Sequence, residues 1–227
     1  MLYDASRAGN ASAELFEPAY WHARAATSRA PGGRGTTLFL DDGARHWVLR
    51  HYFRGGTVAK LLGDRYLWTG EARTRPFREL RMLADLRAEG LPVPVPVAAR
   101  YERNGLLYRG DLITERIPDA RPLSVWLEEA PLPAQAWRAI GLCLREFYDL
   151  GVWHADLNAH NVLLDSSGNV SVIDFDRARR RKPGPALSGK NLGRLAHSLD
   201  KLRRTRPRFH CGETEWGLLL AAHRAHG

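Results

Sequence analysis

The chain has 227 residues, 44% of them hydrophobic and 26% charged, which are the proportions of an ordinary globular protein. This composition excludes a disordered chain. No apolar stretch approaches the roughly 18 to 20 residues that span a bilayer, so a membrane-embedded body is excluded too. Two cysteines are too few for a disulfide framework or a cysteine-based zinc site. The first residues lack a basic start followed by an apolar run, and we therefore expect a cytoplasmic protein.

The formal net charge is +9, because 34 lysines and arginines stand against 25 aspartates and glutamates. A basic surface attracts polyanions. Nucleic acid, anionic lipid headgroups and phosphorylated substrates would all satisfy that attraction, so the charge alone does not choose among these partners.

The first predicted elements are two strands joined by a tight turn. Residues 36–40 and 47–52 read as strands, and the Asp-Asp-Gly turn signal at 41–43 lies between them. A helix follows, because apolar residues recur at helical spacing from Pro76 to Gly90. Together these elements predict an antiparallel sheet with one main helix.

An extended connector and a second pair of strands are predicted after this helix. Prolines in residues 91–97 disfavour the helical region for each residue before them. Residues 106–108 and 112–117 then read as strands around a turn at 109–111.

Pro118 ends the last of these strands and marks the boundary between two predicted lobes. We expect an N-terminal extension at 1–30, a first lobe at 31–118 and a second lobe at 119–227.

The second lobe is predicted to be short and mainly helical. A helical stripe over 137–148 stops at a glycine, the residue type that most often follows the end of a helix. A hairpin with arms at 162–164 and 170–173 comes next. Apolar stripes at 192–202 and 216–222 predict two further helices.

The most informative segment is the polar stretch between the first of these helices and the hairpin. It reads His-Ala-Asp-Leu-Asn-Ala-His-Asn over 154–161, and Asp-Phe-Asp follows the hairpin at 174–176. A hairpin that starts after Asn161 and ends at Asp174 brings these two side chains to the same end. Phosphoryl transfer needs a carboxylate facing the substrate hydroxyl and hard oxygen ligands for magnesium. Asp156, Asn161 and Asp174 can supply these parts.

These motifs resemble the catalytic loop and the magnesium loop of the protein-kinase-like superfamily, in its aminoglycoside-phosphotransferase-like and lipopolysaccharide-kinase branches. The resemblance implies a two-lobed α+β fold, in which an N-lobe of antiparallel sheet and one main helix precedes a short, mainly helical C-lobe. It also implies ATP as the phosphate donor and Mg²⁺ as the cofactor. Asp156 would then be the catalytic residue, and Asn161 and Asp174 the magnesium ligands.

Each of these residues also has a structural interpretation. Asp156 could cap a turn, Asp174 could end a strand, and Asp176 could either assist the metal or cap the next turn. His154 usually packs as a scaffold for the loop in folds of this kind. Functional roles are favoured for Asp156 and Asp174, because residue types, spacing and flanking strands agree.

The first lobe holds the candidates for binding ATP. A glycine-rich stretch after Pro31 would let backbone amides approach the phosphates, as in the family's glycine-rich loop, although glycines are also common in hairpin turns. Where the family has a strand lysine, this chain has Arg50, whose permanent charge would pair with Glu79 and phosphate, and Lys60 is the rival. The full set of candidates is Gly32, Gly33, Gly35, Arg50, Lys60, Glu79 and Glu115.

Two basic clusters lie in the second lobe, at 177–182 and 201–206. They could meet anionic lipid headgroups, at about 1 kcal/mol for each basic residue near a charged surface, or they could form a solvated basic face. The chain after Asp174 is too short for the peptide-docking platform of protein-substrate kinases. No zinc finger or aromatic-interleaved RNA-binding signature accompanies the charge, so no nucleic-acid partner is expected.

Several segments resemble one group within the lipopolysaccharide-kinase branch, the bacterial kinases of 3-deoxy-D-manno-octulosonic acid (Kdo). The resemblance extends from about residue 20 to about residue 202. It implies that ATP phosphorylates the 4-hydroxyl of Kdo attached to a lipid A precursor, on the cytoplasmic side of the inner membrane of a Gram-negative bacterium. Peripheral contact with an anionic membrane surface would accompany that reaction. The matching segments are residues 33–37, 47–52, 54–56, 63–67, 91–94 and 154–161.

Other functions stay open at this point. A kinase of a lipopolysaccharide core heptose, or of another small alcohol, would use the same motifs. A pseudokinase that only binds lipid would fit the loss of the strand lysine, although intact Asp156, Asn161 and Asp174 argue against it. The residues support a kinase, but they name neither the sugar, nor the residues that hold it, nor the oligomeric state.

Overall fold

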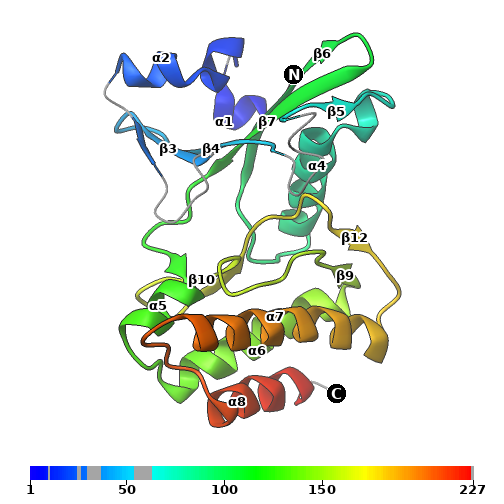
Figure 1. The fold of residues 1–227 in the computed structure, drawn as a ribbon. Helices are drawn as coiled ribbons and strands as arrows, with labels where there is room; N and C mark the ends of the chain where they lie inside the picture. The colour runs from blue at the N-terminus through cyan, green and yellow to red at the C-terminus, as the bar shows by residue number, and fades with distance from the viewer. Residues whose placement is uncertain (10, 25–26, 30–36, 54–62, 226–227) are drawn as a thin grey trace. The chain divides into compact units, whose positions relative to one another are not determined.

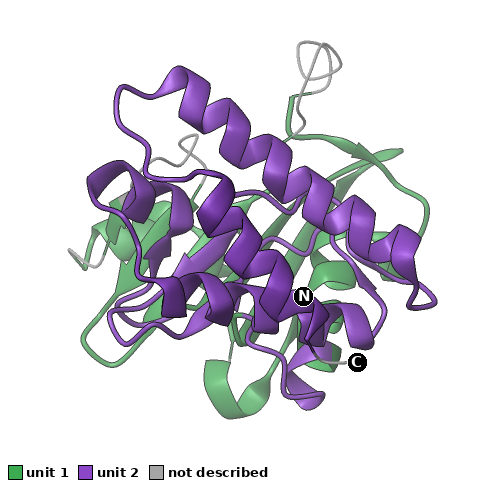
Figure 2. Ribbon diagram, turned by 90° about the horizontal axis from the view of Figure 1, so that it is seen from below, with its two compact units in different colours: residues 1–85, 94–116 green, residues 86–93, 117–227 purple. Residues whose placement is uncertain are grey.

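The computed structural model describes residues 1–9, 11–24, 27–29, 37–53 and 63–225. The chain forms two compact units, which Figure 2 colours separately. Unit 1 comprises residues 1–85 and 94–116, and unit 2 comprises residues 86–93 and 117–227. This mixed structure of two units confirms the predicted α+β fold with two lobes.

Unit 1 is built on an antiparallel sheet. Its strands are β1 (Leu2–Tyr3), β2 (Thr27–Arg29), β3 (Thr37–Asp41), β4 (His46–His51), β5 (Tyr66–Leu67), β6 (Pro96–Asn104) and β7 (Leu107–Glu115). They follow the order β1-β6-β7-β4-β3-β2, with β5 paired to β7 (Figure 1). The predicted strands at 36–40 and 47–52 are confirmed as β3 and β4, in which Leu38 lies opposite Leu49.

The N-terminal segment covers one face of this sheet. Its helical turns are α1 (Ala5–Ala8), η1 (Ala13–Phe16) and α2 (Pro18–His22). Trp21 of α2 is fully buried and packs edge to face on Trp47 of β4, with ring centroids 6.0 Å apart. The described part of residues 1–30 therefore contributes to the core of unit 1.

The main helix of unit 1 lies on the other face. The prediction of a helix around Glu79 is confirmed by α4 (Arg75–Ala88), which follows the short turn η2 (Glu71–Arg73). Side chains alternate along a strand, so Arg50 of β4 points away from the face that carries Leu49. Arg50 meets Glu79 of α4 on that opposite face.

The chain after α4 differs from the prediction in two ways. The last residues of the predicted connector already belong to β6, which begins at Pro96. The predicted turn at 109–111 is wrong, because β7 continues through it. Gly110 has a packing role there instead: a Cβ at this position would lie 2.7 Å from Cγ of Pro76, so only a glycine lets the start of α4 approach the strand.

Unit 2 consists of helices and short strands. They are β8 (Arg121–Pro122), α5 (Leu123–Glu129), α6 (Ala134–Asp149), β9 (Val152–Trp153), β10 (Val162–Leu164), β11 (Val170–Val172), β12 (Arg179–Arg180), α7 (Pro185–Thr205) and α8 (Glu213–Arg224). The predicted hairpin is confirmed as β10 and β11, with Val162 opposite Val172. The sequence did not predict α5, β8, β9 or β12.

The predicted helix before the catalytic loop is α6, and it packs closely on α8 (Figure 1). A Cβ on Gly141 would lie 2.3 Å from the carbonyl oxygen of Leu219, so the two helices are in contact at this glycine. After α6, Gly151 adopts φ of +66°, a left-handed conformation that favours glycine.

The longest helix of unit 2 is α7, with 21 residues. The leucine stripe that predicted it is buried at Leu195, Leu199 and Leu202. Among the helices described, none combines the length and the apolar character needed to cross a membrane.

Candidate active site

The hairpin of unit 2 brings two of the predicted site residues to one end. The carbonyl oxygen of Asn161 accepts a hydrogen bond of 2.9 Å from the backbone N–H of Ile173. Asn161 lies just before the first arm of the hairpin, and Asp174 lies just after the second arm. The two residues therefore lie at the same end of the hairpin. This part of the prediction is confirmed.

The loop before the hairpin is folded around the backbone of Asp156. The carbonyl oxygen of Asp156 accepts hydrogen bonds from the side-chain nitrogens of Asn158, at 3.0 Å, and Asn161, at 2.9 Å. Oδ1 of Asn158 in turn accepts from the backbone N–H of His160. These bonds fix the loop while the side chain of Asp156 stays exposed, so this carboxylate is accessible to a substrate hydroxyl.

Asn161 and Asp174 have the properties that a magnesium site requires. Because Nδ2 of Asn161 donates to the loop, its Oδ1 is the side-chain atom that can face a cation. Asp174 has φ of +68°, a conformation that costs a residue with a side chain about 1–3 kcal/mol and is concentrated at functional sites. Amide and carboxylate oxygens are the hard ligands that Mg²⁺ prefers. These two residues therefore fit this cofactor.

His154 joins the catalytic loop to the residue before Asp174. Its side chain is buried, and its Nδ1 accepts a hydrogen bond from the backbone N–H of Asp156, at 3.2 Å. Its Nε2 lies 3.0 Å from the carbonyl oxygen of Ile173 and must carry the proton to bond with it. Burial lowers the pKa of His154, which favours this neutral tautomer. The geometry thus supports the scaffold role of His154.

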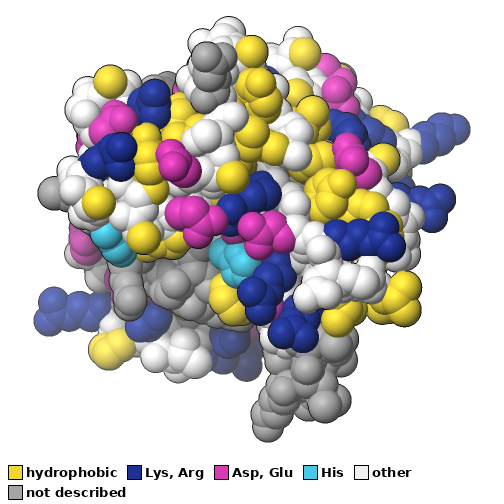
Figure 3. All heavy atoms as spheres, turned by 90° about the horizontal axis from the view of Figure 1, so that it is seen from above, with side chains coloured by type: hydrophobic (Ala, Val, Ile, Leu, Met, Phe, Trp, Pro, Cys, Tyr) yellow, Lys and Arg dark blue, Asp and Glu magenta, His cyan; other side chains and the backbone are white. Residues whose placement is uncertain are grey.

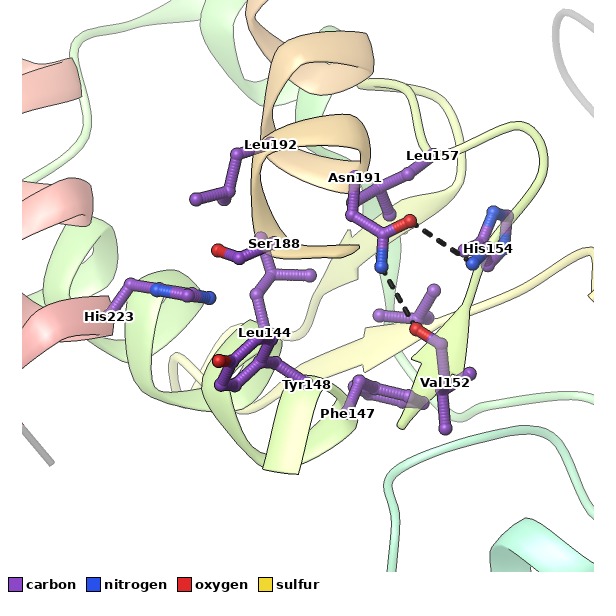
Figure 4. Close-up of a pocket in the computed structure, with 11 residues that line it drawn as sticks. Leu144, Phe147, Tyr148, Val152, His154, Leu157, Ser188, Asn191, Leu192 and His223 are labelled. Carbon is purple, nitrogen blue, oxygen red and sulfur yellow. Dashed lines mark hydrogen bonds between the residues drawn. The ribbon is translucent and has the colours of Figure 1, made fainter. Parts of the chain in front are cut away.

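Asn191 of α7 holds the same segment from the other side, and the sequence did not single it out. Its Oδ1 accepts from the backbone N–H of His154, at 3.2 Å, and its Nδ2 donates to the carbonyl oxygen of Val152, at 2.9 Å (Figure 4). The side chain is buried. The only sequence feature that could have pointed to Asn191 is its position beside the leucine stripe of a predicted helix.

Two serines fix the second half of the loop. Ser124, at the start of α5, is buried; its Oγ lies 2.7 Å from Nδ1 of His160, and its backbone N–H donates to the carbonyl oxygen of Ala159. Oγ of Ser198 on α7 accepts from the N–H of Ala159. Both serines were also missed, since their contacts lie far away in sequence.

Unit 1 contains the predicted pair of Arg50 and Glu79, with a third member. Nη2 of Arg50 pairs with Oε2 of Glu79, and the hydroxyl of Tyr52 donates to the same oxygen at 2.5 Å. Arg50 also donates to the Tyr52 hydroxyl at 3.2 Å. Glu79 and Tyr52 are both buried, and burial together with the negative charge of Glu79 raises the pKa of Tyr52 well above its usual value. Tyr52 therefore stays a neutral donor to Glu79.

Of the other predicted nucleotide-binding residues, the structure describes only Glu115. Glu115 lies opposite Trp47 at the end of β7, and its carboxylate pairs with Arg7 of α1. The remaining candidates lie outside the described residues; they are Gly32, Gly33, Gly35 and Lys60.

Comparison with known proteins also indicates a kinase. A sequence model of the lipopolysaccharide kinase (Kdo/WaaP) family matches residues 18–220. The chain is 45% identical over 208 residues to a 3-deoxy-D-manno-octulosonic acid kinase of Xanthomonas axonopodis pv. citri, covering 92% of this chain and 83% of the relative. Kinases of the same name from Stenotrophomonas maltophilia and Photobacterium profundum are 45% and 42% identical, covering 89% and 90% of this chain and 81% and 86% of the relatives.

The resemblance drawn from the motifs is confirmed by these matches, which cover both units and include the catalytic loop. The chain belongs to the lipopolysaccharide kinase (Kdo/WaaP) family.

Proposed function

We propose that this chain transfers the γ-phosphoryl group of ATP to the 4-hydroxyl of Kdo attached to a lipid A precursor. The observation that carries the proposal is the loop of unit 2, which presents an exposed Asp156 next to the Asn161 and Asp174 pair, in a chain whose relatives are named as Kdo kinases. The reaction belongs to the synthesis of the lipopolysaccharide core.

Asp156 would orient the acceptor hydroxyl and take its proton as phosphoryl transfer proceeds. A positioned base of this kind contributes typically about 10²- to 10⁴-fold in rate. The carboxylate must be exposed to reach a hydroxyl, and it must be held still to orient it. The exposed side chain supports the first condition, and the bonds of the backbone N–H and carbonyl groups to His154, Asn158 and Asn161 support the second.

Oδ1 of Asn161 and the carboxylate of Asp174 would hold Mg²⁺. A magnesium ion held there would supply positive charge that neutralises the charge developing on the phosphate oxygens of ATP. The orientation of the Asn161 amide and the left-handed backbone at Asp174 support these roles.

Arg50 would contact the ATP phosphates in place of the family's lysine. Its pairing with the buried Glu79 fixes the guanidinium, and its charge does not depend on pH in the physiological range. Lys60, the three glycines after Pro31 and Glu115 stay candidates for the same nucleotide.

We further propose that the protein works as a peripheral protein on the cytoplasmic side of the inner membrane, because its acceptor carries a lipid. Figure 3 shows Lys and Arg side chains at several places on the face that it draws, interspersed with acidic and hydrophobic ones. Of the two basic clusters, 201–206 is largely paired with acidic residues, since Arg203 and Arg204 bond Asp200. The cluster at 177–182 is the better supported candidate for anionic lipid.

The test is phosphate transfer from labelled ATP and Mg²⁺ to a Kdo-bearing lipid A precursor. A heptose-bearing core and a lipid without sugar serve as parallel acceptors. Transfer that depends on Kdo is the expected result. Transfer to heptose alone would make the chain a heptose kinase, and the absence of transfer to any acceptor would indicate a lipid-binding pseudokinase.

A further inference from the structure

Two arginines of unit 2 lie over one tryptophan just before the catalytic loop. Trp153 immediately precedes His154, and in the β9–β12 pair it lies opposite Arg179. Cζ of Arg181 is 5.8 Å from the centroid of the Trp153 ring, and Cζ of Arg194 is 5.9 Å from it. The segment after β12 and the helix α7 thus bring a guanidinium group each to the same aromatic side chain.

Both arginines are fixed to the segment that leads to Asp156. The backbone N–H of Arg181 donates to the carbonyl oxygen of Gly151 at 2.7 Å. Arg194 lies on α7 one turn after Asn191, whose side chain bonds the backbone of His154.

The charges of these two arginines are not balanced by the protein. Both side chains are exposed, and within the described part of the chain neither forms an ion pair with a carboxylate. The neighbouring Arg180, in contrast, forms an ion pair with Glu89, with 2.6 Å between its Nη2 and Oε2 of the glutamate. Two exposed guanidinium groups, at 5.8 and 5.9 Å from the centroid of the same ring, give this part of unit 2 a local positive charge that attracts an anion.

We infer that Arg181 and Arg194 form, beside Trp153, the site that binds an oxyanion of the acceptor. The inference rests on the proposed function, in which the acceptor carries a carboxylate on its sugar and phosphates on its lipid. A guanidinium binds either group with two parallel hydrogen bonds, which fixes orientation as well as position. The tryptophan ring supports both guanidinium groups by cation–π contact.

Steady-state kinetics of Arg181→Gln, Arg194→Gln and the double variant test the site. Each single variant is expected to raise the KM for the Kdo-bearing acceptor by at least about tenfold, as for the loss of a charged hydrogen bond, and to leave the KM for ATP unchanged. Arg194→Lys keeps the positive charge but loses the planar guanidinium that makes two parallel hydrogen bonds. Its acceptor KM should lie between the values of the wild type and Arg194→Gln. Arg208→Gln is the matched control, since Arg208 is an exposed arginine in the loop after α7.

Modified acceptors identify the anion without any substitution in the protein. The wild type is assayed with the methyl ester of the sugar carboxylate and, separately, with a dephosphorylated lipid. The modification that removes the bound group should raise the acceptor KM of the wild type, and it should cause no further increase in the double variant.

The outcomes separate this site from the proposed function. If the wild type transfers no phosphate to Kdo, the proposed function fails, and the acceptor site fails with it. If transfer occurs but neither arginine variant changes the acceptor KM, or if the wild type tolerates both modified acceptors, only the site is overturned. Thermal unfolding of each variant checks that a kinetic change does not reflect loss of structure.

Discussion

Oδ1 of Asn191 accepts a hydrogen bond from the backbone N–H of His154 at 3.2 Å, and this contact ties α7 to the catalytic loop. The same side chain donates to the carbonyl oxygen of Val152 at 2.9 Å. Asn191 therefore satisfies two buried backbone groups of the segment that leads to Asp156. It acts through that segment, so we regard it as a positioning residue.

Replacement of Asn191 by leucine should lower both stability and turnover. The N–H of His154 and the carbonyl group of Val152 would lose their partner, at about 1–3 kcal/mol for each buried group left unsatisfied. Turnover should fall while the KM for ATP changes little, and Asn191→Asp should recover part of the turnover because it keeps the acceptor for His154. Urea unfolding and steady-state kinetics measure these effects. Equal stability and turnover in Asn191→Leu and the wild type would contradict the positioning role.

Asp156→Asn should sharply reduce transfer without unfolding the protein. The variant keeps the size of the side chain but cannot accept the proton of the acceptor, and a loss of about 10²- to 10⁴-fold in turnover is expected. Stability should be unaffected because the side chain is exposed. Asp200→Asn, which removes two surface ion pairs worth about 0–1 kcal/mol each, is the control and should retain activity. Near-normal turnover of Asp156→Asn would rule out the assignment.

The catalytic loop was predictable from the sequence because its parts are local. Asn158 and Asn161 bond the carbonyl group of Asp156 within five residues, and the hairpin that follows places Asp174 by its own turn. Residue types and spacing therefore indicated which side chains this loop and hairpin bring to one end. The pair of Arg50 and Glu79 was predictable from the family resemblance, although 29 residues separate its members.

The supports of the loop could not be predicted in the same way. Asn191 lies 37 residues after His154, and helical periodicity does not reveal which residue of a helix will meet a distant backbone group. Tyr52 reads as the last aromatic of a strand, and only the packing of α4 shows that its hydroxyl bonds Glu79. Gly110 misled the prediction for a related reason, because its close contact with Pro76 depends on tertiary structure.

Tyr52→Phe should weaken ATP binding through Glu79. The substitution keeps the ring, which lies 4.9 Å from Cζ of Arg50, but it removes the hydroxyl that donates to Glu79 and accepts from Arg50. Stability should fall by about 1.5–3 kcal/mol, the value for a hydrogen bond to a charged group. The KM for ATP should rise several-fold. Tyr3→Phe, at an exposed tyrosine of β1, is the control, and identical ATP kinetics in the two variants would show that Tyr52 does not position Arg50.

Gly141→Ala should destabilise the protein by forcing α6 and α8 apart. The new Cβ would lie 2.3 Å from the carbonyl oxygen of Leu219, and overpacking of this kind costs typically about 1–3 kcal/mol. Gly193→Ala is the matched control on α7, since no atom lies within 4 Å of its Cβ position. That variant should gain about 0.5–1 kcal/mol, as alanine is the better helix former. Thermal unfolding distinguishes the two, and a stabilised Gly141→Ala would show that the helices are not in close contact there.

His51 of β4 lies between two carboxylates of unit 1. Its Nδ1 is 2.6 Å from Oδ1 of Asp111, and its Nε2 is 3.1 Å from Oδ2 of Asp64. Arg100 also pairs with Asp111, and Arg109 with Asp64, so both carboxylates are held in charged networks. The hydrogen bond with Asp111 is the main cause that raises the pKa of His51, opposed by burial and supported by the charge of Asp64.

The raised pKa of His51 predicts a loss of stability as the pH increases. Because the folded protein binds this proton more tightly than the unfolded chain, the contribution is complete below the ordinary histidine pKa of about 6.5 and is lost as the pH rises through the higher folded value. Urea unfolding of the wild type and His51→Gln across this range measures it. The wild type should be the more stable at low pH, and the difference should shrink as His51 loses its proton. A difference that stays constant with pH would mean that His51 contributes by packing rather than by its charge.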